Sequence, residues 1–237
     1  MRVHAWIVTD RWNPVPLTIR AFSEALGTGM LLAIMVGSGI MGENLAGGHT
    51  GLALLANSLA TGAGLVVLIA VLGPVSGAHL NPVVSLVERM RGLLSTPDLV
   101  IYVPAQIAGA MIGVLTAHVM FDLPLVSISG HVRSGPPQWW SEIVATFGLV
   151  LTVLVASRRI PDRTPVLVGL YVFAAYWFTS STSFANPAVA VARGITDTFT
   201  GIRPQDVGPF VAAQLIGATL AFAVWRPVDR VSRSRLS

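Results

Sequence analysis

Residues 73–92 read GPVSGAHLNPVVSLVERMRG, and residues 178–199 read FTSSTSFANPAVAVARGITDTF. In each stretch an Asn, Asn81 or Asn186, directly precedes a proline. Asn is favoured at the N-cap of a helix and Pro at its first position, so each pair predicts a helix start. Both stretches are too apolar for ordinary loops and too short to cross a bilayer. Each is therefore interpreted as a half-helix that begins inside a membrane, where irregular backbone must be buried or line a water-filled cavity.

The composition of the whole chain supports a membrane protein. Of its 237 residues 53% are hydrophobic and 11% are charged, against about 25% charged in a soluble domain. The mean hydropathy is +0.71. Six apolar stretches are each long enough to cross the ~30 Å hydrocarbon layer as a helix, and they lie at residues 17–41, 51–75, 98–121, 138–157, 164–182 and 206–225. The prediction is an all-α membrane protein with six transmembrane helices and two re-entrant half-helices.

Several classes of function are excluded by residues that the chain lacks. Without cysteine there are no disulfides, thiolate metal sites or cysteine nucleophiles. The pI of 10.6 could suggest a nucleic-acid partner, but the arginines do not cluster on one soluble face. No phosphate-binding glycine motif, metal-ligand spacing or nucleophile elbow stands out. We expect no enzyme activity, no cofactor, no metal and no nucleic acid.

The arginines predict the orientation of the chain. All fifteen basic residues are Arg, and twelve of them fall on one side of the predicted spans: Arg2, Arg11, Arg20, Arg89, Arg91, Arg158, Arg159, Arg163, Arg226, Arg230, Arg233 and Arg235. Only Arg133, Arg193 and Arg203 fall on the other. The positive-inside rule therefore predicts a protein of the cell membrane with both termini in the cytoplasm.

The predicted organisation follows from the spans and this orientation. It consists of a cytoplasmic N-terminal segment (1–16), a first repeat with an Asn-Pro-Val half-helix (17–121), an extracytoplasmic connecting loop (122–137), a second repeat with an Asn-Pro-Ala half-helix (138–225) and a basic cytoplasmic tail (226–237).

The two halves of the chain resemble each other. Three residues recur in the same order, at offsets of 118, 105 and 108: Glu24 and Glu142, Asn81 and Asn186, and Gln106 and Gln214. Each half has three spans, so the second copy enters from the opposite side, which makes an inverted 3+3 repeat with a site near the midplane. Two positive helix ends would meet there, repel cations and favour neutral solutes that bear hydroxyl groups. One Asn-Pro pair alone would be explained by capping of an interfacial helix; two matched copies argue against that.

The SGAHLNP and NPA boxes, the paired Glu residues and the Gln-x-x-Gly signatures resemble the major intrinsic protein family, the aquaporins and aquaglyceroporins, over residues ~18–225. The resemblance implies a six-helix bundle with one pore per subunit, assembled as a homotetramer in membrane lipid. The pore boxes are then Asn81, Pro82, Val83, Asn186, Pro187 and Ala188. Val83 replaces the usual Ala.

The resemblance also implies roles for the polar residues around the boxes. Glu24 and Glu142 would accept backbone N–H groups of the re-entrant loops; a proton relay is the alternative for carboxylates inside spans. His79 would present a carbonyl in its loop, and a pH gate is the alternative. Gln106 and Gln214 would satisfy loop or helix backbone.

Four positions form the outer selectivity filter in the family, and its spacing assigns them to Thr61, Ala174, Ser183 and Val189. The last is usually Arg. All four are small or medium and uncharged here, which implies a wide opening without a fixed charge.

The filter favours small neutral solutes larger than water. Both box regions are similar to a bacterial subgroup associated with arsenic detoxification, in which Val also replaces the filter Arg. The expected function is a passive channel for arsenite and methylated arsenicals that also passes glycerol, urea and water. A general glycerol and water channel without an arsenic role, and a proton-coupled transporter, are the alternatives.

Arg193 lies four residues beyond Val189, about 6 Å further along the half-helix. It is a candidate for positive potential at the outer mouth. The alternatives are an ion pair with Asp197 or a side chain that reaches the membrane interface.

Overall fold

A computed structural model describes residues 15–234, with side chains to residue 227. The predictions for Arg2, Arg11 and Arg235 therefore fall outside the described residues, as do the side chains of Arg230 and Arg233. Within the described part the chain is helical and has no strand. The helices are α1 (Leu17–Leu45), α2 (Thr50–Ser76), α3 (Pro82–Met90), α4 (Thr96–Met120), α5 (Pro136–Arg159), α6 (Thr164–Phe178), α7 (Pro187–Ala192) and α8 (Pro204–Ser234), with short 3-10 turns at Pro161–Arg163 and Arg193–Ile195.

Five helices, α1, α2, α4, α5 and α8, are long and apolar enough to cross a membrane. The fifth predicted span, at residues 164–182, is shorter than expected, because α6 has 15 residues and ends at Phe178 instead of residue 182. From Thr179 the backbone is extended, and the Ser- and Thr-rich stretch that follows turns back into the protein. The hydropathy pattern did not predict this end of the helix. The residues that follow are held by hydrogen bonds to other parts of the chain, and hydropathy does not record such bonds.

The helices are arranged as two equivalent sets. α1 packs against α2 and α4, as α5 packs against α6 and α8, and α2 against α6 joins the two sets. Each half-helix also packs against the last helix of the other set, α3 against α8 and α7 against α4. The inverted repeat predicted from the sequence is therefore visible in the packing.

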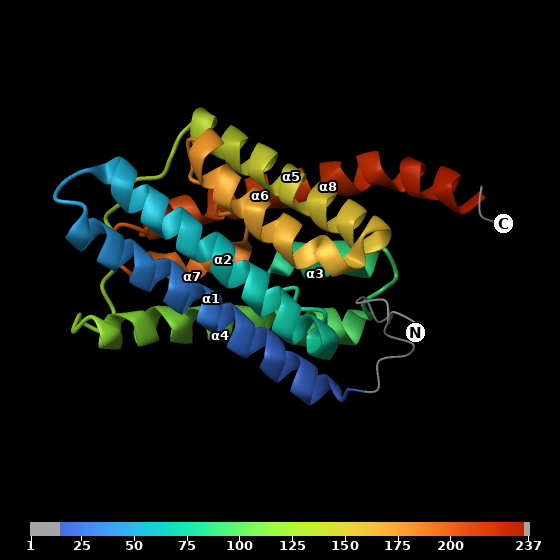
Figure 1. Cartoon of the computed structure of the whole chain (residues 1–237), viewed down its shortest axis with the longest axis horizontal. Helices are drawn as coiled ribbons and strands as arrows, with labels where there is room; N and C mark the ends of the chain where they lie inside the picture. The colour runs from blue at the N-terminus through green and yellow to red at the C-terminus, as the bar shows by residue number, and fades with distance from the viewer. Residues whose placement is uncertain (1–14, 235–237) are drawn as a thin grey trace.

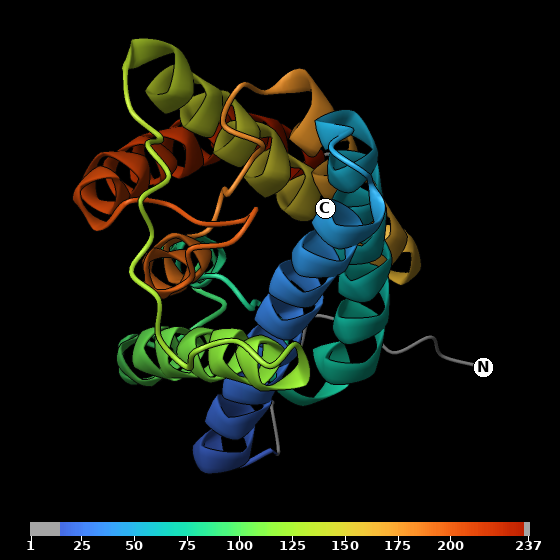
Figure 2. The same ribbon diagram turned by 90° about the vertical axis from the view of Figure 1, so that its left-hand side faces the viewer.

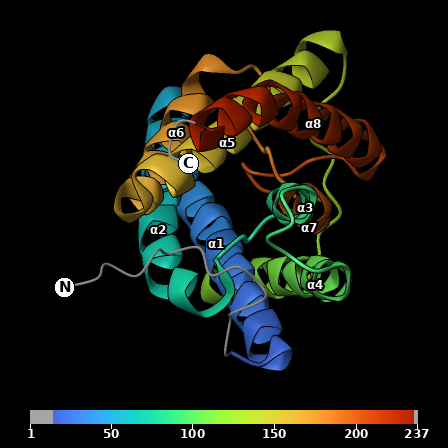
Figure 3. The ribbon, with the colours of Figure 1, turned by 90° about the vertical axis from the view of Figure 1, so that its right-hand side faces the viewer.

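The two half-helices lie end to end in the middle of the bundle (Figure 1). In the two views along the long axis they overlap and lie between α4 and α8 (Figures 2 and 3). The first residues of α1 and the last of α8 lie at the same end of the molecule (Figure 1).

Close helix crossings explain the Gln-x-x-Gly signatures. A Cβ atom at Gly109 of α4 would overlap the backbone carbonyl of Ala25 on α1, and one at Gly217 of α8 would overlap that of Ile143 on α5. Small residues let membrane helices approach to backbone contact. The glycine in each signature thus brings the helix that carries the glutamine against the helix that carries the glutamate.

Candidate functional site

The two Asn residues cap their half-helices and also join them. Asn81 Oδ1 accepts from Val83 N at 3.0 Å, and Asn186 Oδ1 accepts from Ala188 N at 3.0 Å. Each amide then donates across the junction: Asn81 Nδ2 to the carbonyl of Ala185, and Asn186 Nδ2 to that of Leu80, both at 2.8 Å. An amide nitrogen has two hydrogens, so each Asn keeps a second donor for another oxygen.

The loops before the two Asn residues share an uncommon backbone. Ala78 and Ser183, three residues before each Asn, have φ of 47° and 50°; Leu80 and Ala185, one residue before, have φ of 50° and 46°. Residues other than Gly rarely adopt this left-handed backbone conformation, and they keep it only when surrounding groups hold them there. The loops are therefore held by contacts from outside their own sequence.

Two buried carboxylates supply those contacts. Glu24, with no exposed surface, accepts from the backbone N–H groups of His79 and Leu80 at 2.9 and 2.7 Å. Glu142, equally buried, accepts from Phe184 and Ala185 N, both at 2.9 Å.

Each carboxylate has two further donors. A Ser hydroxyl donates to each, Ser76 at 2.7 Å and Ser181 at 2.6 Å, and so does a Gln amide, Gln106 at 2.8 Å and Gln214 at 2.7 Å. Both Ser residues lie five positions before an Asn, a repeated spacing that could have identified them from the sequence. Four charge-assisted hydrogen bonds to each carboxylate hold the loops in their strained conformation.

His79 belongs to the same network on the α3 side. Its Nδ1 lies 3.0 Å from the Ser85 hydroxyl, which also accepts from Gln106 Nε2 at 2.9 Å. The imidazole meets the ring of Tyr102 edge to face, with 5.5 Å between ring centroids. The side chain is thus fixed by contacts at the wall of the cavity described next.

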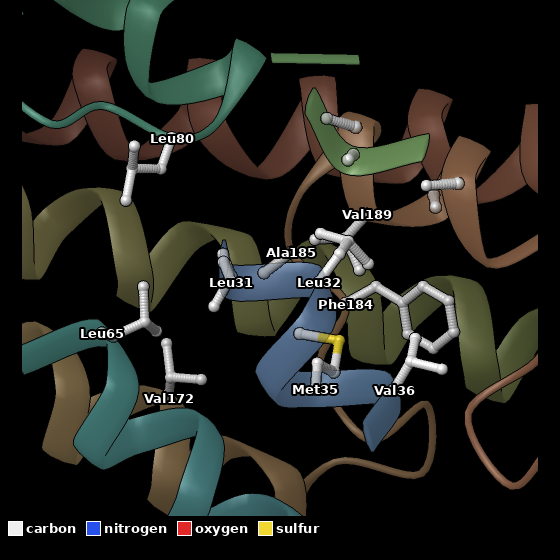
Figure 4. Close-up of a cluster of buried hydrophobic side chains, with 14 of the residues drawn as sticks. Leu31, Leu32, Met35, Val36, Leu65, Leu80, Val172, Phe184, Ala185 and Val189 are labelled. Carbon is white, nitrogen blue, oxygen red and sulfur yellow. The ribbon is translucent and has the colours of Figure 1, made fainter. Parts of the chain in front are cut away.

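A cavity of about 200 Å³ runs along the junction of the two half-helices. Both Asn residues line it, and apolar side chains of the long helices form the opposite wall. Figure 4 shows Leu31, Leu65 and Val172 pointing toward a common space with Leu80. One end, which we call the α3 end, is lined by Arg20, Glu88, Leu93, Leu94 and Asp162; the other, the α7 end, is lined by Met35, Thr61, Ser183, Phe184 and Val189.

The comparison with known proteins agrees with this geometry. Residues 11–185 match the family described as major intrinsic protein. The chain belongs to this family. It is 58% identical over 210 residues to Aquaglyceroporin AqpS of Rhizobium meliloti (strain 1021), covering 89% of this chain and 90% of that one. It is 26% identical over 211 residues to the glycerol uptake facilitator protein of Streptococcus pneumoniae (strain ATCC BAA-255 / R6), covering 82% and 83%.

The fold is that of a solved family member. The X-ray structure of the aquaglyceroporin from Plasmodium falciparum superposes with a TM-score of 0.66 at 20% identity, covering 89% of this chain and 96% of that one. The resemblance and fold class predicted from the sequence are confirmed. As a member of the major intrinsic protein family, the chain is a passive multi-pass membrane channel for small solutes and not an enzyme.

Three of the four filter positions assigned by family spacing lie together. Thr61, Ser183 and Val189 all line the α7 end of the cavity. Ala174 does not join them, because its side chain is exposed on the outer face of α6. Residues 172 and 176 are four apart and share the inward face, whereas residue 174 is turned about 200° from residue 172.

Tyr176 occupies the inward position instead. It is buried, and its hydroxyl lies 3.5 Å from Thr61 Oγ1. The residues at this end are almost inaccessible: Thr61 is 0%, Val189 1% and Phe184 4% exposed. Met35 and Phe184, which also line this end, are bulkier than the four assigned residue types and leave less space than those types alone predict.

Arg193 adopts neither of the alternatives considered from the sequence. Asp197 instead accepts from Gly130 N at 2.9 Å, and Arg193 is 2% exposed rather than reaching the interface. Its guanidinium turns back into the protein, with Cζ 3.5 Å from the centroid of the Phe184 ring. No motif or spacing in the sequence predicts this contact.

Proposed function

We propose that the protein is a passive channel for small uncharged solutes that carry several hydroxyl groups: arsenite and methylated arsenicals, with glycerol, urea and water also permeating. The observation that carries the proposal is a row of polar groups that faces an apolar wall along the middle and the α7 end of the cavity. Asn81 and Asn186 line its middle, and Ser183 lines its α7 end.

The Ser183 hydroxyl is the most direct support. It is buried, and within residues 15–227 its Oγ has no hydrogen-bond partner. A buried hydroxyl without a partner costs free energy, about 1–3 kcal/mol, unless something supplies one. A solute hydroxyl at this place would supply it, and the second donor of each Asn amide would serve the next step along the cavity.

The arsenic part of the proposal rests on relatedness. The relative that is 58% identical is called an aquaglyceroporin, and the chain shares with the arsenic-associated subgroup a Val at position 189. Arsenite is uncharged at neutral pH and carries three hydroxyl groups. It therefore resembles glycerol in the two properties by which this pore would select solutes, hydroxyl groups and size.

We infer that side chains move during transport through the α7 end, because Thr61, Phe184 and Val189 are almost inaccessible to solvent there. Met35 is the best candidate, because its thioether chain is unbranched and has several rotatable bonds. Rotation of Met35 away from Phe184 is the smallest change that would widen this end.

The proton-coupled transporter is the less favoured alternative. It would use Glu24 and Glu142 as coupling sites, yet each carboxylate already accepts four hydrogen bonds. We therefore propose that they act as loop supports, with Gln106, Gln214 and His79 as their auxiliaries.

Comparative flux in liposomes tests the function. The purified chain should carry glycerol, urea, arsenite and methylarsenicals down their gradients, and an uncoupler should not change the rates. Uphill accumulation that an uncoupler abolishes would support the transporter instead. Glycerol flux without arsenite flux would support the general glycerol and water channel.

The assembly and orientation are also proposals: a homotetramer in the cell membrane with both termini in the cytoplasm. The absence of native cysteine makes the orientation easy to test. A single Cys introduced at the C-terminal Ser237 should be protected from an impermeant maleimide in intact cells, and one introduced at His131 should react. Native mass spectrometry should give the mass of four subunits.

A further inference from the structure

Two arginines gather around one aromatic ring beside the α7 end of the cavity. The Cζ atom of Arg193 lies 3.5 Å from the centroid of the Phe184 ring, and that of Arg133, from the loop between α4 and α5, lies 5.0 Å from the same centroid. Phe184 itself lines the cavity. Arginine stacked on an aromatic face is a favourable cation–π arrangement, but two cations on one ring repel each other.

Neutral groups hold both guanidinium groups in place. Arg193 Nε donates to the carbonyl of Thr200, and its Nη1 lies 3.7 Å from the sulfur of Met35. Arg133 Nε donates to the carbonyl of Gly201 at 2.7 Å and Nη1 to that of Ser181 at 3.3 Å. Among the side chains described, neither arginine has a carboxylate within ion-pair distance.

The nearby carboxylates are engaged elsewhere. Glu142 accepts from the second re-entrant loop and Gln214. Asp197 accepts from Gly130 N, and Asp206 pairs with Arg203 at 2.9 Å and accepts from the backbone of Arg133. The positive charge around Phe184 is therefore not cancelled by an ion pair.

Burial of the Arg193 charge is costly, and Arg133 lies partly buried beside it. Arg193 is 2% exposed, and burial lowers the pKa of the Arg133 guanidinium. An unpaired buried cation is expensive in any protein and persists when it has a use. Only one layer of side chains, Met35 and Phe184, separates the Arg193 guanidinium from the cavity.

We propose that Arg193 and Arg133 together provide the positive charge that Val189 omits, and that they exclude protons and metal cations from the pore without touching the permeating solute. This inference rests on the proposed channel function. Because Phe184 and Met35 lie between the charge and the cavity, a solute meets an apolar wall and the Ser183 hydroxyl, while a cation still meets the electrostatic field. The arrangement separates charge selection from size selection.

Proton flux in liposomes tests the proposal. Wild type, Arg193→Met, Arg193→Lys and Arg133→Met are reconstituted, and inward H⁺ flux is driven by a K⁺ diffusion potential and followed with an internal pH dye. R193M should raise H⁺ flux about tenfold, R133M should raise it less, and R193K should stay near wild type because it keeps the charge. Glycerol flux should stay within about twofold in all of them, because neither guanidinium contacts the solute.

Arg203→Met is the matched control, since this arginine lies on the same side but is paired with Asp206. It should leave H⁺ flux unchanged. A folded R193M, judged by its size-exclusion profile, with wild-type H⁺ flux would overturn the proposal. If R193M does not fold, R133M decides in the same way. Failure of the proposed function is separate, because it shows as absent glycerol flux in the wild type.

Discussion

The two ends of the cavity differ in whether their arginines form ion pairs. At the α3 end, Arg20 pairs with Asp98 at 2.9 Å, and Arg91 pairs with Glu88 at 2.6 Å. At the α7 end, Arg133 and Arg193 are held by carbonyls, a sulfur atom and an aromatic ring. An ion pair at a pore mouth presents little net field, whereas two unpaired arginines present a strong one. The cavity therefore has a neutral end and a positive end.

The supports of the two re-entrant loops are, in contrast, nearly identical. Each loop is held by one Glu, one Ser and one Gln, and each has left-handed backbone three residues and one residue before its Asn. These Glu, Ser and Gln residues, which we call the frame, fix where the two Asn residues meet. We propose that selectivity comes from the other residues around the junction, which differ between the two repeats.

Removal of a frame carboxylate should have the largest effect. Glu24→Gln and Glu142→Gln each replace an acceptor-only group by one whose amide faces four donors. Because each buried donor left unpaired costs about 1–3 kcal/mol, we expect a loss of at least ~3 kcal/mol in stability and no solute flux. Thermal unfolding in detergent and glycerol flux measure both.

Glu43→Gln is the control, because Glu43 is exposed on α1. It should behave as wild type. If one of the two frame variants kept normal stability and flux, the loops would not be equivalent and the comparison of the frames would fail.

A second pair of variants tests the difference in charge between the neutral α3 end and the positive α7 end. Val84 and Val189 each lie three residues after an Asn and line the cavity. One helical turn further on, the first half-helix has Glu88 and the second has Arg193. Because an i,i+4 pair shares one helix face, an Arg at position 84 can pair with Glu88, whereas an Arg at position 189 meets a like charge.

Val189→Arg should therefore cut glycerol flux about tenfold or more and water flux less, since the longer side chain also narrows the α7 end of the cavity. Val84→Arg should lose only about twofold. Stopped-flow light scattering measures both solutes. Equal loss of glycerol and water flux in V189R would show that Val189 does not limit solute size.

Most residues of the frame could be predicted from the sequence, because they occur in both halves of the chain. The offsets between the two Glu, Asn and Gln residues, and the Asn-Pro starts, predicted the inverted repeat and the half-helices. The helix starts agreed within two residues, but α1 runs four residues longer than predicted, α6 ends four residues early at Phe178, and α8 continues nine residues beyond residue 225, to Ser234. Ser76 and Ser181, each five positions before an Asn, repeat just as regularly and would have completed the frame.

The α7 end was much less predictable, because it is built by contacts between segments far apart in the chain. Family spacing assigned Ala174, but the rotation of α6 turns Tyr176 inward instead. The gathering of Arg133 and Arg193 on Phe184 depends on how the loop between α4 and α5 folds over the second half-helix. No periodicity or motif in one segment records such a contact.

A smaller effect is expected from the hydroxyl that has no partner. Ser183→Ala should lower glycerol and arsenite flux about fivefold, the equivalent of one hydrogen bond of roughly 1 kcal/mol to the solute. Stability should not change, because Ser183 Oγ makes no bond within the described protein. Ala78 holds the matching place in the first loop, so Ala78→Ser provides the comparison and should leave the flux nearly unchanged. A loss of stability in S183A would mean that the hydroxyl supports the loop rather than the solute.

The smallest effect is expected from mercury. The chain has no cysteine, and Ser183 lies at the α7 end of the cavity, so HgCl₂ should leave wild-type water and glycerol flux unchanged. Ser183→Cys should convert the same channel into one that mercury blocks and a thiol reagent restores, because the new sulfur would line the α7 end of the cavity. Ala78→Cys tests the other side of the junction, where Ala78 also lines the cavity. If mercury blocks S183C more completely than A78C, the α7 end is the tighter barrier to solutes. Equal block would place the barrier at the two Asn residues, between the ends, and would leave the arginines around Phe184 to act on charge alone.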